Sequence, residues 1–186
     1  MDTTKTQARL SATPAEYVGA VLTVKAWLRK YRECIQDIYI CDERVKRITN
    51  RLESVSSPKL TDMPRSPSPA TDRITDMIAQ RDRLVEASAK QRAFVQKTQA
   101  IIDKVLSVCA ARERSIIKLY DLDGMEFGDI IPIVLAKEIQ DGMKYSQCQS
   151  YVYRYRRKAI LKIARTLQDS DGSIYPKLDE VVDMMR

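Results

Sequence analysis

The 186-residue sequence has no histidine, 5 glycines and 4 cysteines, and the cysteines form no CxxC pair. The spacing of Cys34, Cys41, Cys109 and Cys148 does not suit a zinc site, so we expect no structural metal. The chain also lacks the commonest general base, a P-loop, a nucleophile elbow and spaced metal carboxylates, and we therefore expect neither an enzyme nor a cofactor. No signal peptide or membrane-length apolar run is visible, which predicts a cytoplasmic protein that does not engage a membrane.

The composition instead favours an all-α protein, because charged residues make up 31% of the chain and glycine is scarce. Residues 1–13 are polar and aperiodic and are expected to be disordered. Thr13, Pro14 and Glu16 then form a helix-start signal for a long helix to about Val55. Apolar residues recur along it in alternating steps of four and three, as in a coiled coil. These residues are Ala20, Val24, Trp27, Tyr31, Cys34, Ile38, Cys41, Val45, Ile48, Leu52 and Val55.

A second long helix is predicted after a Pro/Ser-rich loop at 56–70, which contains four of the seven prolines. This helix begins at Thr71 or Asp72 and ends near Cys109, and its seam is more polar than that of the first helix. Because the two helices match in length, residues 14–109 are expected to form an antiparallel, coiled-coil-like hairpin. Polar seam residues can fix register and partner choice, so we expect scaffolding together with homo-oligomerisation through the hairpin.

The pattern changes after Cys109, and residues 110–167 are predicted to form a trihelical helix-turn-helix unit. Ala111–Tyr120 is a short amphipathic helix, and Asp121 is expected to help end it in solvent. Met125–Gln140 is a second helical segment that Pro132 kinks or divides. Residues 168–186 form a polar linker and a short acidic helix that starts at Tyr175 and Pro176.

The last helix of this unit, Ser146–Leu167, contains no Asp or Glu. Its packing side consists of Cys148, Val152, Tyr155, Ala159, Ile163 and Leu167, and its other side carries amides, phenols and cations. Such a helix suits a phosphate backbone and the base edges of a major groove, so we interpret it as a recognition helix. Basic amphipathic helices also bind membranes or protein partners, and many are only solvated surface.

Two motifs resemble a known family. Leu60–Pro67 (LTDMPRSP) resembles an L-[ST]-D-M-P-x-S-P loop, and Val152–Ile160 resembles a V-Y-R-x-x-x-x-A-L recognition helix. Both belong to the RinA/ArpU-type late-gene activators of phages and prophages, whose C-terminal part is similar to region 4 of sigma factors. Arg112–Tyr120 also looks like the opening helix of sigma region 4. The resemblance covers roughly residues 25–167, but Pro132–Gly142 adds residues before the turn, which affects the angle of the last helix.

The resemblance implies roles for individual side chains of the last helix. The residues implied to contact bases are Gln149, Ser150, Tyr153 and Arg154. The residues implied to contact phosphates are Lys144, Arg156, Arg157, Lys158 and Lys162. For each cation, a solvated surface charge is the alternative.

The leading hypothesis is a sequence-specific, double-stranded DNA-binding transcriptional regulator in the cytoplasm of a bacterial host. A phage or prophage late-gene activator that also recruits host RNA polymerase is the form that the resemblance implies. Two alternatives remain open at this point. One is a DNA-packaging protein of the small terminase subunit type, and the other is a coiled-coil adaptor that does not bind DNA.

Overall fold

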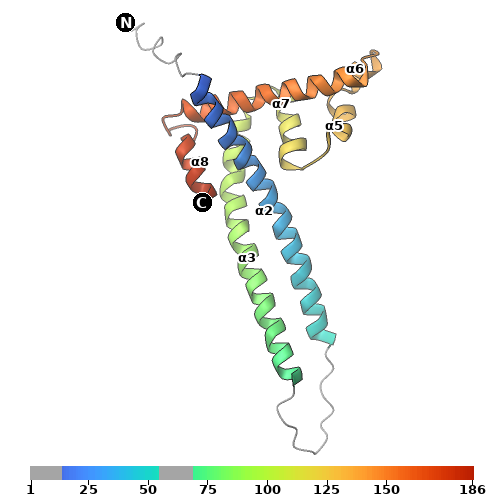
Figure 1. Ribbon diagram of the computed structural model, residues 1–186, viewed down its shortest axis with the longest axis vertical. Coiled ribbons are helices and arrows are strands. Elements are labelled where there is room, and N and C mark those ends of the chain that lie inside the picture. The colour runs from blue at the N-terminus through green and yellow to red at the C-terminus, as the bar shows by residue number, and fades with distance from the viewer. Residues whose placement is uncertain (1–13, 55–68) are drawn as a thin grey trace, which may run out of the picture. The chain divides into compact units, whose positions relative to one another are not determined.

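The computed structural model describes residues 14–54 and 69–186, and every regular element in these ranges is a helix (Figure 1). The all-α class agrees with the prediction. The predicted disordered segment 1–13 and the loop motif at 60–67 lie outside the described residues. No helix within the two described ranges combines the length and apolarity that a membrane crossing requires.

Two long helices, α2 (Pro14–Ser54) and α3 (Pro69–Leu106), form the predicted antiparallel hairpin (Figure 1). Their residues belong to two compact units. One unit is Glu33–Val95, whereas the other joins the first part of α2, up to Arg32, to Gln96–Arg186. The boundaries between the two units fall after Arg32 and after Val95. They therefore do not coincide with the change in sequence pattern near residue 109.

The predicted seam of α2 is buried in its first half. Ala20, Val24, Trp27, Tyr31 and Cys34 are all less than 9% exposed. Farther along, in the unit Glu33–Val95, Ile48 is buried and Ile38, Cys41, Val45 and Leu52 are half-buried, whereas Val55 lies outside the described residues. The packing of α2 is thus tighter in the unit that also contains the C-terminal helices.

The polar seam of α3 finds polar partners on α2 within the unit Glu33–Val95. The buried Ser88 donates a hydrogen bond to Asp42 at 3.3 Å, and the guanidinium of Arg92 lies 2.6 Å from the same carboxylate. Gln91 donates to Asp37 at 3.0 Å. Such contacts define the register of the helix pair, whereas exposed ion pairs contribute little stability.

The C-terminal region begins with α4 (Ala111–Ile116), which continues into a π-helical turn, η1 (Ile117–Leu122). The sequence predicted one regular helix here. The wider turn is closed by the N–H of Asp123, which donates to the carbonyl of Lys118 at 2.8 Å. It leaves Ile117 and Asp121 both buried, so the prediction that Asp121 is solvated at a helix end is wrong.

The second predicted segment forms two short helices, α5 (Phe127–Val134) and α6 (Ala136–Gln140), as Pro132 indicated. The break falls at Leu135, whose backbone is non-helical and whose side chain is fully buried. A turn containing Gly142 follows, and its φ of +89° is rarely adopted by residues with a side chain.

The third helix of the unit is α7 (Tyr145–Gln168), which contacts α4, α5 and α6. Their shared core contains Ile116, Ile130, Ile131, Leu135, Cys148 and Val152. The last helix, α8 (Leu178–Met185), begins three residues later than predicted and packs on α7, with Val181 buried. Within the described residues no cysteine forms a disulfide, and Cys34, Cys109 and Cys148 are buried.

Candidate nucleic-acid interface

The position of α7 is fixed by its packing side. Cys148, Val152, Ala159 and Ile163 are at most 1% exposed, and the predicted packing residue Tyr155 is half-buried. At the start of the helix, the side chain of Gln147 accepts a hydrogen bond from the backbone N–H of Lys144 at 3.2 Å. This bond satisfies one of the N–H groups near the helix start.

The opposite side of the first half of α7 is an exposed surface that we call the outer face, comprising Gln149, Ser150, Tyr153, Arg154 and Arg157. At 100° per residue these side chains spread over an arc of about 140°. All four residues implied to contact bases belong to it. Among the described residues, no acidic side chain is paired with any member of the outer face. It is therefore a convex, cationic and hydrogen-bonding surface.

Aromatic contacts hold part of the outer face in place. The ring of Tyr153 packs on Phe127 of α5, with centroids 4.3 Å apart, and Phe127 also stacks on Tyr120 of η1. The guanidinium of Arg154 lies 5.4 Å from the ring centroid of Tyr151, one turn earlier on the exposed side of the helix. These contacts restrict the rotamers of Tyr153 and Arg154 while leaving both side chains exposed.

Arg156, a predicted phosphate contact, has a protein partner. Its Nε and one terminal nitrogen donate to the two oxygens of Asp121 at 2.9 and 2.5 Å, and its guanidinium lies 4.6 Å from the Tyr120 ring centroid. Burial of the guanidinium lowers the pKa of Arg156, but the hydrogen bonds and charge of Asp121 outweigh burial and raise it overall. This bidentate pair ties α7 to η1.

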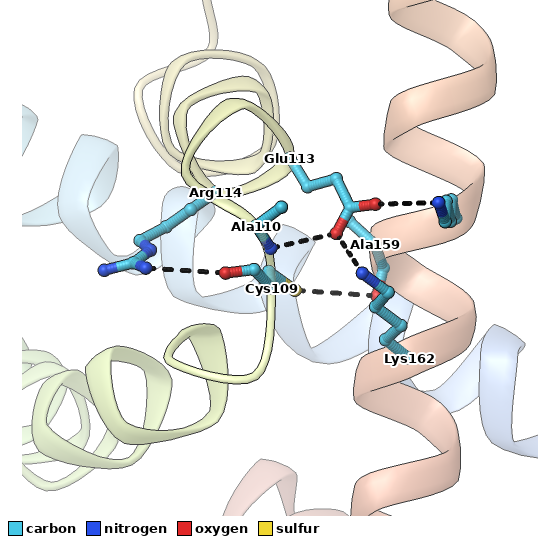
Figure 2. Close-up of polar contacts among 7 residues, drawn as sticks. Cys109, Ala110, Glu113, Arg114, Ala159 and Lys162 are labelled. Carbon is cyan, nitrogen blue, oxygen red and sulfur yellow. Dashed lines mark hydrogen bonds and ion pairs between the residues drawn. The ribbon is translucent and has the colours of Figure 1, made fainter.

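Lys162 and Lys158 are also paired, in this case with Glu113 of α4. The carboxylate side chain of Glu113 is 2% exposed and lies 2.6 Å from Lys162 Nζ and 3.8 Å from Lys158 Nζ. It also accepts the backbone N–H of Ala110 at 3.0 Å, as Figure 2 shows. Burial alone would raise the pKa of Glu113, but the Lys162 and Ala110 hydrogen bonds and the two lysine charges lower it. Glu113 therefore both caps α4 and holds α7.

The same close-up shows how the end of the hairpin meets α7. The thiol of Cys109 donates to the carbonyl of Ala159 at 3.9 Å, and the guanidinium of Arg114 donates to the carbonyl of Cys109 (Figure 2). Burial, followed by the charge of Glu113, raises the pKa of Cys109 to about 11. Cys109 is consequently a protonated, packed thiol at neutral pH.

The five cations implied to contact phosphates thus fall into two groups. Arg156, Lys158 and Lys162 are paired with the acidic side chains of η1 and α4. Lys144 and Arg157 are exposed, and neither forms an ion pair with a described residue. Only the second group has its full charge available to an outside phosphate without first losing a protein partner.

Sequence reasoning missed a second buried strip on α7. Ile160 and Ala164 are at most 1% exposed, although both lie outside the predicted packing stripe. The second half of α7 is therefore enclosed on two sides, and the outer face is confined to the first half. The buried acids Glu113 and Asp121 were missed as well, and the only sequence signal for Glu113 was its position three residues after the helix start.

Comparison of the chain with protein-family models, with curated proteins and with solved structures finds no match in any of the three.

Proposed function

We propose that this protein is a sequence-specific, double-stranded DNA-binding regulator and that the outer face of α7 enters the major groove. The observation that carries the proposal is the exposure of Gln149, Ser150, Tyr153 and Arg154 on an acid-free helix face. A helix of this width fits the major groove, where each base pair presents a distinct set of donors and acceptors.

In this proposal, Arg154 and Gln149 supply most of the sequence discrimination. An Arg side chain can donate two hydrogen bonds to guanine, and a Gln side chain can pair with the N6/N7 edge of adenine. Ser150 and Tyr153 are less selective contacts. Lys144 and Arg157 contact phosphates, which adds affinity without sequence information. Arg156, Lys158 and Lys162 instead orient α7 through Asp121 and Glu113.

The biological role that we propose is that of a phage or prophage late-gene activator. The support is the resemblance of the loop motif and of the last helix to RinA/ArpU-type regulators. Such an activator would act on host RNA polymerase in the bacterial cytoplasm. The hairpin is the element proposed to mediate self-association, since Ile35, Tyr39 and Ile40 of α2 are exposed apolar side chains outside the seam that α2 shares with α3.

The test is selection of random duplex DNA with the full chain, followed by affinity measurements on the selected sequence and on a scrambled one. The proposal predicts an enriched motif and a preference for the selected duplex that persists at physiological salt. Arg154→Ala should reduce this preference, whereas Lys90→Ala, which removes an exposed cation of α3, should leave it unchanged.

Either of two results would contradict the proposal and favour an alternative hypothesis. Absence of any mobility shift at about 50 mM salt, where non-specific binding is strong, would favour the adaptor hypothesis. Binding without sequence preference by a ring-sized assembly, as measured by light scattering, would favour the packaging hypothesis.

A further inference from the structure

A cavity of about 360 Å³ lies between the first part of α2 and the C-terminal helices, within one compact unit. Four cationic side chains line it, Lys25, Arg29 and Arg32 of α2 and Arg156 of α7. Asp121 is the one acidic residue in its lining, and both of its oxygens already accept hydrogen bonds from Arg156. Arg156 is thus already neutralised, and Lys25 and Arg32 supply positive charge that favours an anion in the cavity.

Arg32 lies between the cavity and the loop after η1. One terminal nitrogen of its guanidinium donates to the carbonyl of Tyr120 at 3.4 Å. The Nε–H is buried and has no hydrogen-bond partner among the described residues. Because protein covers this atom, it does not open into the cavity, which other atoms of the Arg32 side chain line.

The loop after η1 keeps Arg32 in this position. Gly124 has a φ of +75°, and a Cβ built on it would lie 3.2 Å from Cδ of Arg32. Glycine thus allows the loop to run directly against the Arg32 side chain. Arg32 is therefore placed by the carbonyl of Tyr120 and by the close approach of the loop at Gly124.

We propose that this cavity binds phosphate, either of a soluble phosphate ester or of the DNA backbone beside α7. Guanidinium groups match phosphate oxygens with paired N–H donors, and a lysine ammonium adds a flexible point charge at the edge. Arg156 is three residues from Tyr153 on α7, so a phosphate held here would lie beside the outer face. If the bound phosphate belongs to DNA, the inference rests on the proposed function. If it belongs to a soluble ester, the inference does not.

The experiment has two arms, both with the full chain. In the first, inorganic pyrophosphate is titrated without DNA and binding is measured by calorimetry at physiological salt. In the second, affinity for the selected duplex is measured across a range of salt concentrations. The variants are Lys25→Glu and its control Lys30→Glu, which makes the same charge change at an exposed position of α2 outside the cavity lining.

If the cavity takes a soluble phosphate ester, pyrophosphate should bind the unmodified chain at one site. Lys25→Glu should then weaken this binding about tenfold relative to Lys30→Glu. Asp121→Asn tightens pyrophosphate binding, because the carboxylate no longer competes for Arg156. For a DNA phosphate, pyrophosphate does not bind, but Lys25→Glu lowers DNA affinity and the salt slope more than Lys30→Glu does.

The inference is overturned if pyrophosphate fails to bind and both glutamate variants bind DNA equally well. It is also overturned if the two variants weaken pyrophosphate binding equally, because the effect would then come from net charge alone. Lys25 and Lys30 are exposed, so both variants should fold, and thermal melting checks this. Failure of DNA binding with intact, Lys25-dependent pyrophosphate binding would remove the proposed function and leave this inference standing.

Discussion

The outer face of α7 and its two flanks, Arg156 on one side and Lys158 and Lys162 on the other, both carry cations, but the cations differ in their partners. Arg154 and Arg157 are exposed and have no acidic partner among the described residues. Arg156 and Lys162, on the same helix, are held by Asp121 and Glu113 at 2.5 to 2.6 Å. The comparison teaches that a basic helix can use some cations to fix its own orientation and others to meet a ligand. Tertiary partners decide which cation does which.

The largest expected effect is on sequence discrimination and concerns the outer face. Arg154→Ala should cost up to about 3 kcal/mol of binding free energy on the selected duplex, because one bidentate base contact is lost. Competition between selected and scrambled duplexes measures the loss. Equal losses on both duplexes would mean that Arg154 meets only phosphate and that the outer face does not read bases through it.

Removing the acidic partner of a flank cation should lower the stability of the fold instead of the sequence discrimination. Glu113→Gln removes the charged acceptor of Lys162 and weakens the cap of α4, which should lower the free energy of unfolding by about 2 kcal/mol. Chemical denaturation measures this change, with Glu86→Gln, an exposed acid paired with Lys90 on α3, as the control. A loss no greater than that of the control would show that Glu113 does not hold α7.

A smaller effect separates the two groups of cations in DNA binding. Arg157→Gln should reduce the slope of log affinity against log salt by about 1, because one phosphate contact is lost. Lys162→Gln should leave the slope almost unchanged, since Glu113 already neutralises Lys162. Equal changes in slope for the two variants would contradict the proposal that cations of the outer face contact DNA and cations of the flanks do not.

The smallest effect is a pH dependence of stability. The pKa of Glu113 is lower in the folded chain than its ordinary value of 4.5, so its contribution is complete above that pH. Stability is lost as the pH falls below 4.5 and through the folded-state pKa, because the protonated acid no longer attracts Lys162. Unfolding free energies of the wild type and Glu113→Gln should converge over this acidic range. A constant difference would contradict the assignment.

The sequence predicted the hairpin well because its information is local. The alternating apolar steps from Ala20 to Ile48 define one face of a helix without reference to any other part of the chain. Pro132 likewise predicted the division between α5 and α6. These features depend on periodicity and on backbone chemistry, both of which can be read from neighbouring residues.

The sequence could not assign the cations of α7, because their partners are remote. Asp121 is 35 residues from Arg156, and Glu113 is 49 residues from Lys162. The π-helical turn that buries Asp121 has no simple periodic signal. Ile160 and Ala164 are buried because the second half of α7 is enclosed from two sides, which a single apolar stripe does not indicate. Prediction therefore identified the helix and its packing side, but not the network that orients it or the limit of its exposed surface.

The central claim is that the outer face of α7 lies against bases when DNA is bound. A photo-crosslinking amino acid at Ser150 tests it most directly, with the same amino acid at Tyr39, an aromatic residue of α2 that is 68% exposed, as the control. The account predicts a crosslink from position 150 to bases within the selected motif and none from position 39. DNA binding without a crosslink at position 150, or with equal crosslinking at both positions, would contradict it.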